Sequence, residues 1–265
     1  MPAPEIQHTF VICAYGKSMY LEECIQSLLA QSVKSQIILA TSTPNDLIQG
    51  MAEKYGIPLH INQGPGGIAQ DWNYAYAQAS TKFITLAHQD DIYEPEYTAC
   101  ALKDLSQAKD PLIWFSDYYE IRHGQRVTKN RLLFIKRLLI SPLRLKALQR
   151  ITFAKRCCLA LGNSICCPAV TFAASSLPKE IFTPHFRSNV DWQAWERFSR
   201  MRGSFQYHPH MLMGHRIHGD SETSKVIGDS QRSSEDLEMF RKFWPLPVAR
   251  RLAQLYASGE KSNKG

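Results

Sequence analysis

The sequence contains no run of 18 apolar residues, which is about the length that a membrane-spanning helix requires. Its first residues, Met1 to Thr9, also have neither the basic region nor the apolar region of a secretory signal peptide. These absences predict a cytoplasmic protein without a membrane span. Seven cysteines, an odd number, then indicate reduced thiols rather than a disulfide framework. The two cysteine doublets, 157–158 and 166–167, lack the C-x₂₋₄-C spacing that is usual in zinc sites.

Acidic residues are missing from one long segment. Between Ile121 and Lys179 there are twelve lysines and arginines and no aspartate or glutamate, so the rest of the chain has a net charge of −5. Within residues 129–156 the basic side chains alternate with Leu and Ile, a pattern typical of short helices on an anionic membrane surface. Aromatic residues on which bases could stack are nearly absent, so we expect no nucleic-acid partner. Ordinary helices that pack on the core and expose a basic rim would give the same pattern.

The first 120 residues alternate short apolar runs with amphipathic segments. This spacing predicts βαβ units and a Rossmann-like, mostly parallel sheet flanked by helices, hence an α/β protein. The predicted strands cover residues 9–14, 35–41, 58–62 and 82–88, and the predicted helices 20–31, 46–55 and 68–79. Beyond residue 120 we expect two short helices broken at Pro142, a helix at 152–161, a strand at 167–174, and helices at 191–201, 234–243 and 248–257.

The apolar run at residues 82–88 stops at two adjacent carboxylates, Asp90 and Asp91. Carboxylates at the end of a buried strand are costly unless solvent or a cation meets them. The crevice outside the carboxyl ends of such strands is also where open α/β sheets bind ligands. The pair therefore suits a hard divalent ion, Mg²⁺ or Mn²⁺, held together with substrate phosphates. The alternative is that Asp90 caps the next helix and Asp91 is solvated.

Two glycine-containing turns and one further carboxylate add to this candidate site. Gly16, after the first strand, lets the backbone approach a ligand closely. The turn at residues 64–67 (Gly-Pro-Gly-Gly) opens a helix whose N-terminal amides suit a diphosphate. This turn is neither a P-loop nor a G-x-G-x-x-G motif. Asp191 lies at a predicted helix start, where capping is the alternative to a catalytic role.

Together these motifs resemble glycosyltransferase family 2, the inverting nucleotide-sugar transferases with a GT-A fold. The similarity covers roughly residues 8–222 and is most specific over 10–31 and 66–97. Residues 10–15 and 20–31 are similar to the family's first strand and helix, and residues 66–91 match its register from the glycine turn to the DXD-type metal motif. Residues 189–192 (Asn-Val-Asp-Trp) resemble its acidic motif. Residues 215–218 (His-Arg-Ile-His), with Ser221 and Thr223, resemble its late Arg-x-His segment.

The resemblance implies a role for each matching position. Asp191 would be the catalytic base, and Asp91 and His218 would hold Mn²⁺ or Mg²⁺. The donor would be a nucleotide sugar, with a UDP-sugar favoured, and the acceptor a hydroxyl of a glycan or of a lipid-linked molecule. Arg216 would meet the diphosphate, and Asp90 the ribose. The full set of expected donor contacts is Ala14, Tyr15, Thr41, Ser42, Gly67, Asp71, Asp90 and Arg216.

Several positions depart from the family pattern. Thr41 and Ser42 stand where the family usually has aspartates that contact the base and ribose, so the identity of the base is open. Trp72 replaces the usual arginine, His88 replaces the first acidic residue of the metal motif, and Gly16 replaces an asparagine. These departures leave an alternative function, a catalytically inactive transferase-like protein that binds a nucleotide or a glycan.

We expect residues 1–230 to form the GT-A domain, with a nucleotide-binding half (1–120), a basic helical insertion (121–165) and an acceptor and catalytic half (166–230). Residues 231–265 would form a C-terminal helical tail. The implied setting is bacterial cell-surface polysaccharide or lipopolysaccharide synthesis, by a cytoplasmic protein peripheral to the inner face of the membrane. Two other enzyme classes fit less well. A zinc hydrolase lacks its Glu-x-x-His partner near His208 and His210, and a nucleotidyltransferase lacks its glycine-rich, arginine-containing loop at residues 14–18.

Overall fold

The computed structural model describes residues 6–218 and 230–261, so Ser221 and Thr223 lie outside the described residues. The strands are β1 (His8–Ala14), β2 (Gln36–Thr41), β3 (Leu59–Ile61), β4 (Phe83–His88), β5 (Ile92–Tyr93), β6 (Pro111–Arg122), β7 (Gln125–Val127), β8 (Val170–Ala173) and β9 (Ser204–Ile217). The helices are α1 (Leu21–Leu29), α2 (Asp46–Tyr55), α3 (Ile68–Ala77), α4 (Tyr97–Gln107), α5 (Arg131–Ile140), α6 (Thr152–Cys157), α7 (Val190–Arg200), α9 (Ser230–Arg241) and α10 (Leu246–Lys261).

The described strands form one sheet in the order β3-β2-β1-β4-β8-β6-β9-β5, with β7 paired to β6. β3, β2, β1 and β4 are mutually parallel, and so are β6 and β9. β8 runs antiparallel between β4 and β6. The predicted α/β class with a mostly parallel sheet is confirmed. Because β2, β1 and β4 are neighbours, their carboxyl ends at Thr41, Ala14 and His88 meet at one edge of the sheet.

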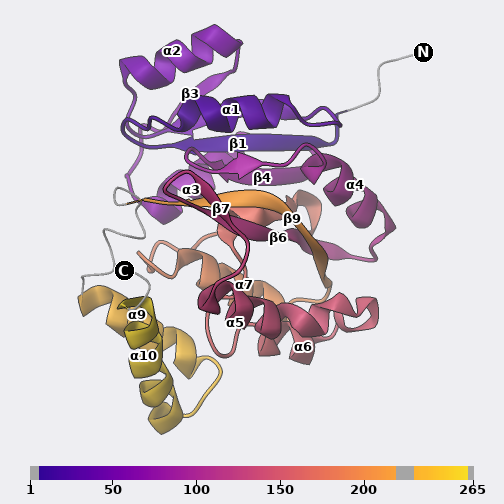
Figure 1. Cartoon of the computed structure of the whole chain (residues 1–265), viewed down its shortest axis with the longest axis vertical. Helices are drawn as coiled ribbons and strands as arrows, with labels where there is room; N and C mark the ends of the chain where they lie inside the picture. Colours follow the sequence, from indigo (N-terminus) through magenta and orange to yellow (C-terminus); the bar gives the residue numbers. More distant parts are fainter. Residues whose placement is uncertain (1–5, 219–229, 262–265) are drawn as a thin grey trace.

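Side-chain alternation along β1 supplies a core to each face of the sheet. Val11 belongs to the cluster that includes Trp192 and Trp195 of α7, whereas Phe10 and Ile12 belong to the cluster under α1. Both tryptophans of α7 are fully buried. Figure 1 shows α1 and α2 at one end of the molecule and α9 and α10 at the opposite end.

In the segment after β6, the helices are interrupted near Pro142, as the sequence predicts. α5 ends at Ile140, and Pro142 enters a short 3₁₀ turn, because proline cannot donate the next helical hydrogen bond. α6 ends at Cys157, four residues before the predicted end at Leu161. The chain then turns through Gly162, whose φ of 145° is a conformation that other residues rarely adopt. This turn carries Leu161 and Asn163 to the site described below.

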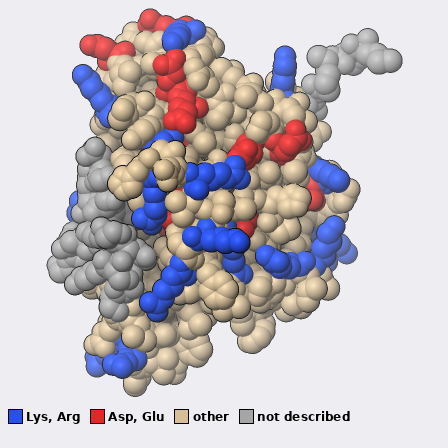
Figure 2. Space-filling view, in the orientation of Figure 1, with Lys and Arg blue, Asp and Glu red and all other residues tan. Residues whose placement is uncertain are grey.

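Much of the positive charge of the basic segment is neutralised inside the described structure. Figure 2 shows Lys and Arg side chains spread over the middle and lower part of one face. Five of the twelve basic residues form ion pairs with acidic residues before or after the segment: Arg122–Glu120, Arg126–Glu94, Arg137–Asp117, Arg150–Asp110 and Arg156–Glu196. The buried amino group of Lys155 instead donates to the carbonyls of Met201 and Gly203. The excess of positive charge read from the sequence therefore overstates the charge available to a partner.

No helix of the described residues is both long enough and apolar enough to cross a membrane.

Candidate active site

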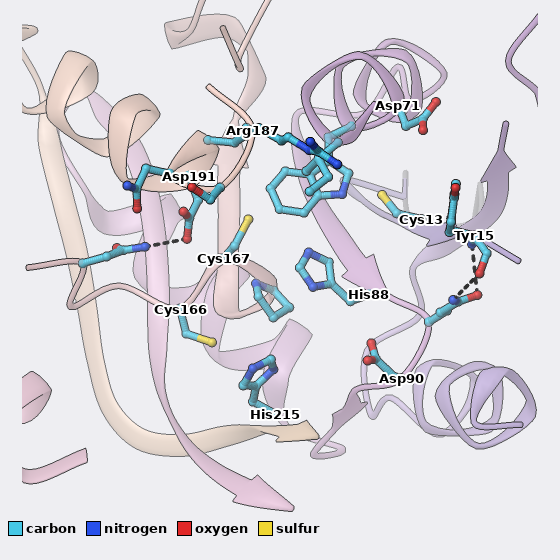
Figure 3. Close-up of a pocket in the computed structure, with 18 of the residues that line it drawn as sticks. Cys13, Tyr15, Asp71, His88, Asp90, Cys166, Cys167, Arg187, Asp191 and His215 are labelled. Atoms are coloured by element: carbon cyan, nitrogen blue, oxygen red, sulfur yellow. Dashed lines mark hydrogen bonds between the residues drawn. The ribbon is translucent and has the colours of Figure 1, made fainter. Parts of the chain in front are cut away.

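A cavity of about 1630 Å³ opens at the edge where β1, β2 and β4 end. It extends past the start of α7 to α5 and α10, which also contribute lining residues. Figure 3 shows Tyr15 and Asp71 on one side of it, Asp191 on the other and His88 between them. Of the predicted site residues, nine line this cavity: Ala14, Tyr15, Thr41, Ser42, Gly67, Asp71, Asp90, Asp191 and His218. Asp91 and Arg216 do not line it.

Asp71 organises the end of the cavity nearest β2 and α3. Its carboxylate accepts hydrogen bonds from the Ser42 hydroxyl and the Asn62 amide, each at 2.8 Å, and lies 3.4 Å from the Gly67 amide nitrogen. Gly67, the N-cap of α3, has a φ of 139°, and it lines the cavity together with Ile68, the first residue of that helix. A helix N-terminus of this kind attracts anions. The structure thus brings Ser42, Gly67 and Asp71 together.

The end of β1 is fixed to the end of β4 through one side chain. The Gln89 amide donates to the carbonyl oxygen of Tyr15 at 2.7 Å, and its oxygen accepts from the Tyr15 amide at 3.1 Å. The Gly16 amide donates to the Thr43 hydroxyl at 2.7 Å. The Tyr15 backbone is therefore held at the cavity wall, while more than half of its side chain remains exposed.

His88, Asp90 and Asp91 place ligand atoms within 4.8 Å of one another at the end of β4. The two carboxylates differ in their surroundings. Asp90 faces the cavity, and one of its oxygens lies 2.8 Å from Nε2 of His218. Asp91 is fully buried, accepts a hydrogen bond of 2.8 Å from the Arg216 amide and lies 3.1 Å from Nδ1 of His215. Neither carboxylate caps α4, whose N-cap is Glu96.

Electrostatics reinforce the difference between these groups. Burial alone would raise the pKa of Asp91, but His215, His88 and the Arg216 amide hold it below its usual value. Burial would likewise lower the pKa of His215, and the neighbouring Asp91 carboxylate raises it. Both shifts favour a charged Asp91–His215 pair. For His88 burial prevails, so its pKa is lowered and the ring is neutral near neutral pH.

Arg216 does not line the cavity. Its guanidinium binds the Glu23 carboxylate of α1 and the carbonyl oxygen of Asp90, and it lies 4.2 Å from the centre of the Tyr20 ring. With its backbone amide on Asp91, Arg216 thus contacts the Asp90-Asp91 turn on two sides. This geometry makes Arg216 a residue that holds the turn in place, and its predicted contact with the diphosphate stays a prediction.

Two of the departures from the family pattern contact each other. The rings of Trp72 and His88 stack with their centres 4.9 Å apart, and the Phe182 ring packs edge-on against Trp72. Nε2 of His88 is buried and has no hydrogen-bond partner in the part of the chain that the structure describes. His88 belongs to the group with Asp90 and Asp91, and its other ring nitrogen, Nδ1, lies 3.9 Å from an Asp91 oxygen.

Asp191 lies in the first turn of α7, one residue after the helix begins. It does not cap the helix, because Asn189 occupies the N-cap position. One carboxylate oxygen accepts from the Asn163 amide at 2.7 Å and the other from the Trp192 backbone at 2.8 Å. Burial raises the pKa of Asp191, although both hydrogen bonds oppose the shift. A carboxylate held this way suits a general base.

Sequence reasoning missed several residues of the site. His215 was part of a matched motif, so its contact with Asp91 could have been sought there. The contact of Asn163 with Asp191 spans 28 residues and follows from the turn at Gly162, which carries no recognisable motif. Glu23 reads as an ordinary acidic residue in the first turn of α1. Only the folded chain shows that it binds Arg216.

Comparison with known structures places this fold among those of glycosyltransferases. Residues 1–349 of S. aureus TarS, in complex with UDP-GlcNAc, superimpose with a TM-score of 0.63 at 14% identity, over 94% of this chain and 70% of that TarS chain. The mannosyltransferase PcManGT from Pyrobaculum calidifontis, in complex with GDP-Man and Mn²⁺, gives 0.59 at 13% identity, over 98% and 76%. Glucosyl-3-phosphoglycerate synthase from Mycobacterium tuberculosis, with Mn²⁺ and UDP-glucose, gives 0.57 at 17% identity, over 91% and 80%.

No curated protein sequence matches the chain. The family model "Glycosyl transferase family 2" matches residues 9–166, more than half of its length. The chain therefore belongs to glycosyl transferase family 2. The predicted resemblance and the GT-A type of fold are confirmed, and the protein is a glycosyltransferase.

Proposed function

We propose that this protein is a metal-dependent, inverting glycosyltransferase that moves a sugar from a nucleotide-diphosphate donor to an acceptor hydroxyl. One observation carries the proposal. The half-buried carboxylate of Asp191 lines the same cavity as Asp90, His218 and the N-terminus of α3. A base, a candidate metal site and an anion-binding helix end therefore share one space, as displacement of a nucleoside diphosphate requires.

The ligand atoms at the end of β4 suit a hard divalent cation. Carboxylate oxygen and imidazole nitrogen suit Mn²⁺, and carboxylate alone suits Mg²⁺. We assign Asp90 and His218 to the ion, because both line the cavity and their ligand atoms are 2.8 Å apart. Asp91, predicted from the sequence as a ligand, supports the turn from behind through Arg216 and His215. When bound, the ion would neutralise charge that develops on the leaving diphosphate.

The chemistry of transfer rests on Asp191. Its carboxylate accepts the proton of the acceptor hydroxyl as that oxygen attacks the anomeric carbon from the face opposite the diphosphate. A single base without a second carboxylate as nucleophile gives inversion of configuration. Asn163 orients the carboxylate through one oxygen. The raised pKa makes the carboxylate a stronger base than an exposed aspartate.

For the donor we propose a UDP-sugar held by the residues near Asp71. The backbone of Ala14 and Tyr15 with Thr41 would bound the base, Ser42 and Asp71 would meet the ribose, and the amides after Gly67 would meet the diphosphate. The structural relatives bind UDP-GlcNAc, UDP-glucose and GDP-Man, which supports a nucleotide-sugar donor and leaves the base to experiment.

We place the reaction in bacterial cell-surface polysaccharide or lipopolysaccharide synthesis, on an acceptor that is a glycan or is lipid-linked. We also propose that residues 129–156 contact an anionic membrane surface, as this setting would require. Large apolar side chains are exposed there, among them Phe134 at 67% and Phe153 at 77% of their surface. Solvent-exposed Lys129, Arg131 and Lys146 lie in the same segment.

Thermal unfolding tests the proposed function. We expect one of UDP, GDP, dTDP and CMP to raise the unfolding temperature only with Mn²⁺ present. A ligand at a hundred times its dissociation constant stabilises by about 2.7 kcal/mol. Asp90→Asn should abolish the shift, and Leu29→Ser, a change on the exposed face of α1, should leave it intact. No response to any nucleotide would contradict the proposal and favour a non-catalytic glycan-binding protein.

A further inference from the structure

The cavity is larger than its donor half needs. Ligand sites typically enclose about 300–1,000 Å³, whereas this cavity measures about 1630 Å³. Beyond Asp191 its lining changes from polar to apolar. The apolar side chains come from three separate segments, α5, the turn after α6, and α10: Leu132, Ile135, Leu139, Leu161, Leu252 and Tyr256.

Contacts of Tyr256 with Trp192 and with the turn at Gly162 place this apolar half next to the base. The Tyr256 ring of α10 lies 5.7 Å from the ring of Trp192, the neighbour of Asp191. A Cβ at Gly162 would stand 2.7 Å from the same tyrosine ring, so Gly162 lets α10 approach the turn that carries Asn163. Lys136 of α5 lies within electrostatic reach of both Asp191 and Tyr256. α5, α10 and the base therefore border a single space.

The same half of the cavity reaches solvent along an apolar edge. Ile135 and Leu161 line it and are still 41% and 48% exposed. On the outer side of α5, Phe134 and Leu138 are exposed and do not line it. α5 therefore presents apolar side chains both to the cavity and to the outer surface, and Ile135 lines the cavity while remaining partly exposed. Singly exposed apolar side chains are ordinary, but contiguous ones at a cavity mouth indicate a binding surface.

Charge and hydrogen bonding complement an anionic, hydroxyl-bearing ligand. Arg131, Lys136 and Arg187 line the cavity. The side-chain oxygen of Asn163 is buried and accepts no hydrogen bond among the described residues, while its amide holds Asp191. A buried acceptor without a donor costs free energy, which a substrate hydroxyl placed beside Asp191 would recover.

We propose that the acceptor carries an anionic head group on a hydrocarbon chain, and that the chain lies between α5 and α10 with the hydroxyl at Asn163 and Asp191. This inference rests on the proposed function and specifies its acceptor. Aliphatic lining side chains remove the hydrocarbon from water, and the cationic lining meets the head group.

Calorimetric titration with alkyl phosphates tests the inference, using monomeric dodecyl phosphate as the probe and butyl and inorganic phosphate as controls. Each buried methylene contributes about a fourfold gain in affinity. We therefore expect one dodecyl phosphate to bind at least about 100-fold more tightly than butyl phosphate, if four or more of the extra methylenes are buried. Ile135→Asn/Leu161→Asn should remove most of this gain, and both positions are exposed enough for the variant to fold.

The matched control is Phe134→Asn/Leu138→Asn, which changes the outer side of α5 and should retain the gain. Equal affinity for dodecyl and butyl phosphate, absence of binding, or equal loss in both variants would overturn the inference. UDP and the other nucleotides with Mn²⁺, titrated into the same preparations, separate the two proposals. Nucleotide binding without chain binding refutes only the lipid acceptor. Chain binding without nucleotide binding refutes the transferase assignment.

Discussion

At the scale of single residues, the site depends on carboxylates that are chemically alike and placed differently. Asp90 faces the cavity and His218. Asp91, the next residue, is fully buried against Arg216 and His215. Asp191 combines partial burial with only two hydrogen bonds and has a raised pKa. Environment, more than residue type, separates ligand, scaffold and base here.

Substitutions at Asp90 and Asp91 should therefore fail in different ways. Asp91→Asn removes a charge that His215 and a backbone amide meet in the interior, so we expect a loss of about 3 kcal/mol in the free energy of unfolding. Asp90→Asn should change stability by less than about 1 kcal/mol, yet abolish the stabilisation by nucleotide with Mn²⁺. Urea unfolding of both variants, with and without ligand, measures this. The reverse pattern would make Asp91 the metal ligand.

Asp191→Asn should lower hydrolysis of the sugar nucleotide by about 100- to 10,000-fold, the usual range for a general base. Binding of the nucleoside diphosphate should be unchanged, because the base does not touch the nucleotide in the proposed mechanism. Initial rates and titration calorimetry on one preparation measure both. Equal losses of rate and binding would show that Asp191 only supports the fold.

The pH profile should identify Asn163 as a positioning residue. Asp191 must be ionised to act, so the rate falls as pH drops through its raised pKa. The hydrogen bond from Asn163 stabilises the carboxylate and lowers that pKa. Asn163→Ala should therefore move the acid limb of kcat/KM to higher pH. A uniform loss of rate with an unmoved limb would contradict this role.

At the scale of elements, strand ends and helix starts converge on the cavity. The turn at Gly162 determines how closely α10 approaches them. β1, β2 and β4 bring their carboxyl ends together, and α3 and α7 point their first turns at the same space. On the far side, α10 approaches Asn163 only because Gly162 has no side chain. The single glycine at position 162 thus sets the width of the apolar half of the cavity.

Gly162→Ala should narrow that half and leave the donor half intact. The new methyl group would meet the Tyr256 ring at 2.7 Å, and φ of 145° disfavours alanine. We expect a loss of about 1–3 kcal/mol in stability. Dodecyl phosphate should bind more weakly and UDP with Mn²⁺ as before. A parallel loss of both would show that the turn supports the whole cavity.

At the scale of the whole molecule, the parallel part of the fold was predictable and the contacts of the site were not. Alternating apolar runs set β1 to β4 and α1 to α3, because local periodicity determines them. The buried position of Asp91 and the contacts of Arg216 depend on pairing between β9 and the turn after β4, which lie more than 120 residues apart. The inward ion pairs of Arg137 and Arg156 likewise require partners from outside the basic segment.

These internal contacts limit which residues can be substituted to test membrane contact. Lys136 donates to the Tyr118 hydroxyl and Arg137 binds Asp117, so neither reports on the surface. Phe134→Ser/Leu138→Ser/Phe153→Ser instead removes exposed apolar side chains, and flotation with phosphatidylglycerol vesicles should fall by about tenfold or more. Leu29→Ser, on the distant α1, should float like the wild type. Unchanged flotation of the triple variant would exclude this surface.

The stack of Trp72 on His88 has an optical consequence. Trp114, Trp192 and Trp195 are fully buried. Trp72 instead lines the cavity, and its ring stacks on the imidazole of His88, which lies close to Asp90. Indole emission depends on the charge and polarity of whatever touches the ring. A cation or a phosphate that binds at the end of β4 would change the environment of the Trp72 ring. The intrinsic fluorescence of Trp72 should therefore report whether the site is occupied.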